Sequence, residues 1–361
     1  MLKARDAVRN LKEYHPPLGN RQGLRLDFNE NTAGCSPRVL ERLRSITQEE
    51  LARYPERDPG EKTIAGHLKI SPEEVILTNG TDEAIHLICE TYLEPGHEAV
   101  ICTPTFAMYE IYAGANGVKV VAAQARDDFR FPAEEVLAKI SAQTRFIAVA
   151  NPNNPTGTLA PQQDLLRIAK AAPQAALLVD EAYFEFAGET LLPQWREVPN
   201  LFVARTFSKA YGLAGLRIGV LMGNVEQMRM VRRASSPYNL NSVALACLPA
   251  AIDDQAYVRR YVSEALAGRA QLEKELSERG VKYWPSRANF VLMYFGDAGK
   301  AFIAAMRERG VLVRDRSGDP GCKGCVRITV GSAEHNARLM RELKEVLDSM
   351  RELAGAKEGR L

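Results

Sequence analysis

A lysine that could act as a nucleophile follows one of the apolar runs of this sequence. Lys209 lies in RTFSKAYGLAGLRIG, directly after the run Leu201 to Ala204, with Ser208 beside it and Arg217 shortly after it. A lysine whose pKa is lowered by neighbouring cations is a competent nucleophile toward carbonyl groups. A hydroxyl and a guanidinium close by suit a phosphate group. An isolated lysine is more often an exposed loop charge, so this interpretation depends on the other motifs.

An aspartate ends a second apolar run, in LLVDEAYFEF. The Asp180 carboxylate could hold a protonated ring nitrogen of a ligand, and Tyr183 could reach a phenolic oxygen. Aspartate is also a good helix N-cap. The two readings of Asp180 are about equal on this segment alone, and the presence of Lys209 favours the first.

Three more segments follow apolar runs and offer groups for binding. In ANPNNPTGTLA, the neighbouring prolines could present the Asn154 amide rigidly, although Asn and Pro also form simple turns. In LTNGTDEAIHLI, the sequence Gly80-Thr81-Asp82 begins a predicted helix, whose free N–H groups could bind a phosphate or could simply be capped. In CTPTFAMYE, Phe106 offers a flat ring for stacking, although a phenylalanine is more commonly part of the core.

The elements that must position these residues alternate between strand-like and helical patterns. Short apolar runs bounded by Gly, Pro and Asn indicate buried strands, and their alternation with amphipathic stretches predicts a mostly parallel sheet of seven strands with helices on both faces. Ligands of such sheets collect where loops leave the strand C-termini. The predicted strands are Glu74–Leu77, Ala99–Cys102, Val118–Ala122, Phe146–Ala150, Ala176–Val179, Leu201–Ala204 and Ile218–Met222.

The pattern changes after Pro237. A helical stretch over Leu240–Glu278, with a break expected at Pro249, leads to apolar segments at 290–294, 311–314 and 326–330 and to further helical sequence. We therefore expect an α/β chain of two domains. The large domain comprises residues 41–240, and the smaller α+β domain joins residues 1–40 to 241–361.

Composition excludes several classes of protein. The 361 residues are 46% hydrophobic and 25% charged with a net charge of +2, which is typical of a globular protein and not of a general nucleic-acid binder. No apolar run is long enough for a membrane span, and the charged start predicts a cytoplasmic protein. The lone Cys322-Lys-Gly-Cys325 motif lacks the further ligands of a structural metal site, so we expect no metal.

In this order, the motifs NPNNPTG, VDEAY and TFSKAYGLAGLR resemble the class II pyridoxal-phosphate aminotransferases of fold type I, over nearly the whole chain. The resemblance implies pyridoxal 5'-phosphate as cofactor, small-molecule substrates and a homodimer. Net charge and the lack of a long apolar run argue against nucleic acid or a membrane as partner. The resemblance implies that Lys209 forms the Schiff base and moves the substrate proton, while Asp180 keeps the ring nitrogen protonated. It also implies a cofactor site made of Gly80, Thr81, Asp82, Phe106, Asn154, Tyr183, Thr206, Ser208 and Arg217, completed by Tyr54 of the neighbouring subunit.

Within this family the chain is most similar to the histidinol-phosphate aminotransferases. The arm VRNLKEY ends at Tyr14, LDFNEN contains Asn29, and GVLVRD and CVRITVG bring Arg314 and Arg327, two arginines that could clamp an anion. These four residues are the expected substrate site for histidinol phosphate and 2-oxoglutarate, used in turn in a ping-pong reaction. The open alternatives are an aromatic amino-acid aminotransferase, a threonine-phosphate-type decarboxylase, and a non-catalytic regulatory protein of the same fold. Arg327 alone could bind a carboxylate, with Arg314 in a surface ion pair.

Overall fold

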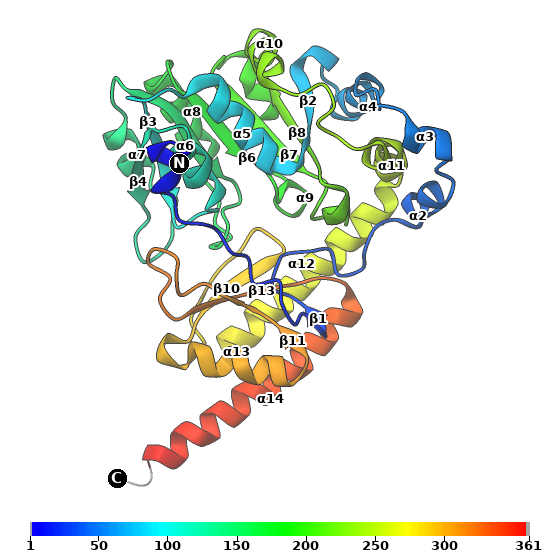
Figure 1. Ribbon diagram of the computed structural model, residues 1–361. Helices are drawn as coiled ribbons and strands as arrows, with labels where there is room; N and C mark the ends of the chain where they lie inside the picture. Colours follow the sequence, from blue (N-terminus) through cyan, green and yellow to red (C-terminus); the bar gives the residue numbers. More distant parts are fainter. Residues whose placement is uncertain (1, 359–361) are drawn as a thin grey trace.

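The structure is a computed structural model that describes residues 2–358. Two regions are visible, one built on a large sheet and one on a small sheet, and the long helix α12 runs between them (Figure 1). None of the described helices is both long and apolar enough to cross a membrane.

The large sheet has seven strands in the order β2-β8-β7-β6-β5-β3-β4. All neighbours are parallel except β8, which runs antiparallel to β2 and β7. The predicted mostly parallel seven-stranded sheet is confirmed. The strands are β2 (Val75–Asn79), β3 (Glu98–Thr103), β4 (Lys119–Gln124), β5 (Thr144–Ala150), β6 (Ala176–Asp180), β7 (Leu201–Thr206) and β8 (Ile218–Gly223).

Helices cover both faces of this sheet because successive strand residues point to opposite sides and both sets are apolar. In β7, Val203 packs into one buried cluster and Phe202 into the other. The helices on the Phe202 side are α5 (Gly80–Tyr92), α6 (Met108–Ala115) and α10 (Val225–Ala234). Those on the Val203 side are α4 (Asp58–Leu68), α8 (Gln162–Ala171) and α11 (Ser242–Asp253).

The small sheet is antiparallel, in the order β12-β13-β10-β9, and a short parallel pair joins β1 to β11. Helix α14 lies below this region and its C-terminal end projects from the molecule (Figure 1). The strands here are β1 (Leu24–Arg25), β9 (Tyr283–Trp284), β10 (Phe290–Tyr294), β11 (Val311–Leu312), β12 (Arg314–Asp315) and β13 (Cys325–Thr329). The helices are α12 (Gln255–Glu278), α13 (Gly299–Glu308) and α14 (Ala333–Glu358). The remaining α-helices are α1 (Asp6–Arg9), α2 (Pro37–Arg44), α3 (Gln48–Ala52), α7 (Ala133–Lys139) and α9 (Phe184–Ala187).

The prediction that the long helical stretch breaks at Pro249 is wrong. Pro249 lies inside α11, and the break falls at Asp254, between α11 and α12. A proline removes only one helical N–H donor, and the packing of α11 against the buried cluster compensates for it. Asp254 ends the first helix because its side chain accepts the Tyr257 N–H, at 3.3 Å, and so caps the second.

Candidate functional site

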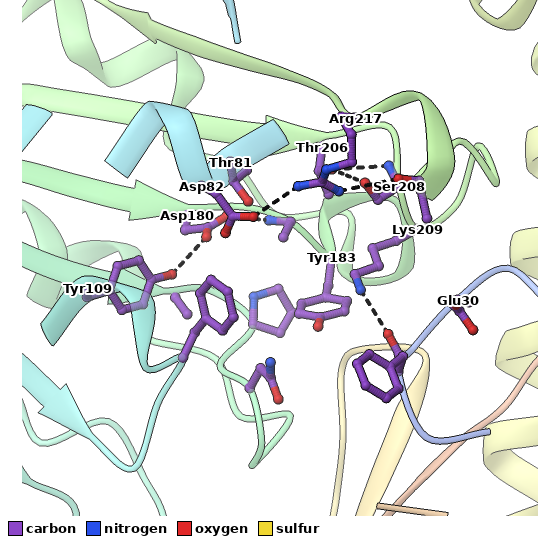
Figure 2. A pocket seen from close by; sticks show the side chains of 17 residues that line it. Glu30, Thr81, Asp82, Tyr109, Asp180, Tyr183, Thr206, Ser208, Lys209 and Arg217 are labelled. Carbon is purple, nitrogen blue, oxygen red and sulfur yellow. Dashed lines mark hydrogen bonds and ion pairs between the residues drawn. The ribbon is translucent and has the colours of Figure 1, made fainter. Parts of the chain in front are cut away.

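A cavity of about 280 Å³ opens at the C-terminal ends of β5, β6 and β7. This is the edge at which ligands of parallel sheets bind. Figure 2 shows side chains from β6, from the loop after β7 and from the start of α5 pointing into one space. The lining includes most of the expected cofactor residues, namely Thr81, Asp82, Phe106, Asn154, Asp180, Tyr183, Thr206, Ser208, Lys209 and Arg217.

The Lys209 amine lines this cavity and has a lowered pKa. Its Nζ donates a hydrogen bond to the carbonyl oxygen of Phe28, at 3.0 Å (Figure 2). Burial, followed by the positive charge of Arg327, lowers the pKa of Lys209 to about 8. An amine with this pKa is partly neutral at physiological pH, and a neutral amine is the nucleophilic form.

Asp180 ends β6 with its carboxylate buried and held by two donors. The Tyr109 hydroxyl donates to Oδ2 at 2.8 Å, and the Ala182 N–H donates to Oδ1 at 3.0 Å. Burial raises the pKa of Asp180 to about 6, against the opposing effect of these two hydrogen bonds. The group is therefore mainly ionised at neutral pH, which suits a carboxylate that must pair with a protonated ring nitrogen.

The part of the cavity lined by the start of α5 and by Arg217 fits a phosphate group. Asn79, the N-cap of α5, gives no side-chain hydrogen bond to the helix, so the N–H groups of the first turn are left for a ligand. Gly80 has a φ of +74°, and a Cβ there would lie 2.6 Å from the Arg217 guanidinium. The positive φ favours glycine, and a side chain there would also displace the guanidinium. Arg217 pairs with Asp82 at 2.9 Å, and the Thr206 hydroxyl donates to the Ser208 hydroxyl at 2.9 Å.

Tyr183 and Asn154 also line the cavity and are hydrogen-bonded to residues of, or next to, the small sheet. Asn29 donates from Nδ2 to the Tyr183 hydroxyl at 2.9 Å. Thr329 in turn donates to Asn29 Oδ1 at 3.0 Å, and Arg327 donates to Asn154 Oδ1. Burial raises the pKa of Tyr183. Two of the expected cofactor residues, Tyr183 and Asn154, are therefore hydrogen-bonded to two of the expected substrate residues, Asn29 and Arg327.

A second cavity of about 230 Å³ adjoins the first and contains the two expected substrate arginines. Arg314 on β12 lies directly opposite Arg327 on β13 in the strand register, so both side chains lie on one face of the small sheet. Arg327 donates to the Asp27 carbonyl oxygen at 2.8 Å. Burial, then the charge of Arg316, lowers the pKa of Arg327 to about 9. Tyr14 and Asn29 also line this cavity, whose crowded guanidinium groups favour an anionic ligand.

Of two further expected cofactor residues, Phe106 lines the cavity and Tyr54 lies outside it. Phe106 lines both cavities, with its ring edge-on to Tyr109 at a centroid distance of 5.9 Å. Tyr54 does not line the cavity of its own chain. Its side chain is 79% exposed and its ring lies 4.6 Å from that of Tyr238. The expectation that Tyr54 reaches the site of a second subunit stays a prediction.

Sequence reasoning missed several residues of the site. Tyr109 lies in the same CTPTFAMYE segment as Phe106, one helical turn further on, and only its contact with Asp180 distinguishes it from a core tyrosine. Arg316 and Asp319 form an ion pair beside Arg314 and Arg327, in a loop whose course the sequence does not show. The carbonyl oxygen of Phe28 carries no signal in the sequence at all.

Comparisons with known proteins identify the family to which this chain belongs. The family model for aminotransferase class I and II matches residues 21–347. The histidinol-phosphate aminotransferase of Geobacillus sp. (strain WCH70) is 38% identical over 348 residues, covering 94% of each chain. That of Bacillus cytotoxicus is 35% identical over 347 residues, covering 94% of this chain and 93% of the relative.

The fold has a solved counterpart. The crystal structure of histidinol-phosphate aminotransferase from Sinorhizobium meliloti in complex with pyridoxal-5'-phosphate superimposes with a TM-score of 0.87 at 24% identity. The match covers 97% of this chain and 99% of the other. On the family match and the full-length relatives, this chain belongs to the class I and II aminotransferases.

Proposed function

We propose that this protein is a pyridoxal-phosphate-dependent aminotransferase that moves the amino group of histidinol phosphate to 2-oxoglutarate. The products are imidazole acetol phosphate and glutamate. One observation carries this substrate choice. Arg314 on β12 and Arg327 on β13 lie directly opposite each other in the strand register and line a cavity that Lys209 also lines. Two adjacent guanidinium groups suit the phosphate of the donor better than one would.

Pyridoxal phosphate, when bound, supplies an aldehyde that accepts the amino group and a pyridine ring that delocalises electrons from the reacting carbon. The start of α5 with Arg217, Thr206 and Ser208 would hold its phosphate, and Asp180 its ring nitrogen. Tyr183 and Asn154 would bind its ring oxygen. The buried Asp180 and the uncapped start of α5 are observations of this structure that fit such a group.

Lys209 is the residue that moves the proton. Its neutral Nζ would take the proton from the amino-bearing carbon of the substrate and return it in the course of the amino transfer. Its pKa of about 8 places this exchange near the operating pH. The hydrogen bond to the Phe28 carbonyl oxygen keeps Nζ on the side of the cavity next to the small sheet.

The arginine pair serves both substrates in the proposed cycle. Arg314 Nη1 and Arg327 Nε are buried and make no hydrogen bond within the described residues, so each has a donor left for an anion. The donor would place its phosphate there and the acceptor one carboxylate. Tyr14, which lines this cavity and is 42% exposed, would cover the bound substrate and exclude water.

The remaining parts of the proposal concern organisation. We propose a homodimer in which Tyr54, exposed in the single chain, reaches the partner's cofactor phosphate. We propose a large domain over 41–240 and a small domain of 1–40 with 241–361. All six cysteines are free thiols, which supports a location in the cytoplasm, where thiols stay reduced.

A substrate panel tests the proposed function. The purified protein is assayed with 2-oxoglutarate and, separately, histidinol phosphate, phenylalanine, tyrosine and phosphothreonine. We expect the highest kcat/KM for histidinol phosphate. A preference for phenylalanine by more than about 10-fold, about 1.4 kcal/mol of discrimination, would favour an aromatic aminotransferase instead. Release of carbon dioxide from phosphothreonine would favour a decarboxylase, and Lys209→Ala with full turnover would remove the catalytic assignment.

A further inference from the structure

The clearest contact of Asp180 comes from a residue that has no place in the proposed mechanism so far. Tyr109, on α6, is completely buried, and its hydroxyl donates to Asp180 Oδ2 at 2.8 Å. Figure 2 shows Tyr109 beside Asp180, with a dashed line joining the hydroxyl to the carboxylate, and on a different element from those that bring Lys209 and Arg217. The ring itself is fixed by edge-on packing against Phe106.

The charges around Asp180 explain why such a donor matters. Asp180 is buried, and the nearby carboxylates of Asp82 on α5 and Glu181 after β6 both disfavour its ionised form. Within the described residues two donors oppose them, the Tyr109 hydroxyl and the Ala182 N–H, one on each oxygen. A hydrogen bond to a charged acceptor is stronger than one between neutral groups. Tyr109 therefore stabilises the form of Asp180 that can pair with a cation.

The hydrogen bond from Tyr109 also fixes the orientation of the Asp180 carboxylate. A carboxylate oxygen has more than one acceptor direction, and the tyrosine occupies one of those on Oδ2 from inside the protein. Asp180 lines the cavity, so the directions left free are available to a ligand there. Because the phenol ring is buried and packed, this orientation is present before any ligand binds.

We propose that Tyr109 is a positioning residue that holds Asp180 ionised and oriented, and thereby sets how strongly the protein retains the proton on the ring nitrogen of its cofactor. This rests on the proposed function, because it assumes that Asp180 faces that nitrogen. Tyr109 acts only through Asp180 and does not itself touch the substrate.

The test compares Tyr109→Phe with Tyr92→Phe. Tyr92 on α5 is a matched control, because its hydroxyl also makes one side-chain hydrogen bond, at 2.8 Å, but to Gln227 and not to Asp180. Both changes remove one oxygen atom and keep the ring. The first measurement is the dissociation constant of pyridoxal phosphate from the purified protein. We expect Tyr109→Phe to weaken binding by about 10- to 100-fold and Tyr92→Phe to leave it within about 3-fold of the wild type.

The second measurement separates positioning from a loss of packing. The visible absorbance of the bound cofactor is followed against pH. A less firmly held ring proton leaves less positive charge near the nitrogen that joins the cofactor to Lys209, so that nitrogen should keep its own proton to higher pH. The pH at which half of this absorbance change has occurred is the midpoint of the titration. We expect this midpoint to rise by about one pH unit in Tyr109→Phe. A merely structural role would lower stability without moving this midpoint.

A double variant tests whether the effect passes through the carboxylate. On an Asp180→Asn background, Tyr109→Phe should cause no further shift of the midpoint, because the charge that it supports is gone. An unchanged midpoint in Tyr109→Phe, or an equal shift in Tyr92→Phe, would overturn the inference. If the wild type binds no pyridoxal phosphate, the proposed function itself fails. If the wild type binds it and the Tyr109→Phe variant binds and titrates in the same way, only the role of Tyr109 fails.

Discussion

Replacing Arg314 by glutamine should reduce the reaction of the phosphorylated donor while leaving the protein folded. The Arg314 guanidinium is half-buried, lies 5.0 Å from the centre of the Phe28 ring and leaves Nη1 without a hydrogen bond in the described part of the chain. Arg327 is different, because it already donates to Asn154 and to the Asp27 carbonyl oxygen. Removing Arg327 would break the structure of the site as well as the contact with substrate.

The magnitude follows from the charge of the lost contact. A hydrogen bond between charged groups contributes about 1.5–3 kcal/mol, which corresponds to about 10- to 150-fold in kcat/KM. The unphosphorylated analogue histidinol cannot make this contact. Its kcat/KM should therefore change by less than about 3-fold, within about 0.7 kcal/mol.

The assay measures kcat/KM for histidinol phosphate and for histidinol with the wild type, Arg314→Gln and a control, Arg167→Gln. Arg167 on α8 is half exposed and pairs with Glu134 and Asp164, away from both cavities. The control should behave as the wild type. Equal losses for both donors in Arg314→Gln would refute the reasoning, since they would mean that Arg314 supports the site generally and does not bind the phosphate.

Three further predictions concern stability and the cofactor site. Arg205→Met leaves the fully buried Glu181 without its ion-pair partner at 2.8 Å, so urea unfolding should show a loss of about 3–5 kcal/mol, much of it recovered in the double variant with Glu181→Gln. Burial raises the pKa of Asp180 from 3.8 to about 6, so in cofactor-free protein its contribution to stability is complete below pH 3.8 and is lost as the pH rises through about 6. This loss amounts to about 3 kcal/mol. The test measures Tm against pH for the wild type and for Asp180→Asn, and an identical pH dependence in the two proteins would contradict the prediction. Gly80→Ala, which places a Cβ 2.6 Å from the Arg217 guanidinium at a φ of +74°, should weaken pyridoxal phosphate binding by at least about 10-fold, measured as the dissociation constant.

Much of the fold was predictable because the signals are local. Each strand of the large sheet is a short apolar run, so its position could be identified from neighbouring residues alone. The same is true of Asp180 at the end of β6 and of Lys209 after β7, which share an edge simply because parallel strands end on the same side. The start of α5 at Gly80 also carries its own local signature.

The helix break shows where a local signal is insufficient. A proline inside an apolar helical stretch predicts a break, yet α11 continues through Pro249 because its packing offsets one missing hydrogen bond. The break falls at Asp254, where a side chain caps the next helix. Which of the two signals prevails depends on contacts that are distant in the sequence.

By itself, the sequence determined which residues could do chemistry and at which strand ends they lie, because periodicity and turn residues act over a few positions. Only the tertiary structure decided that Arg314 faces Arg327, that Tyr109 supports Asp180, and that the Phe28 carbonyl oxygen holds the amine of Lys209. Strand register and the packing of separate elements create these contacts. Both depend on the whole chain having folded, and no short window of sequence contains that information.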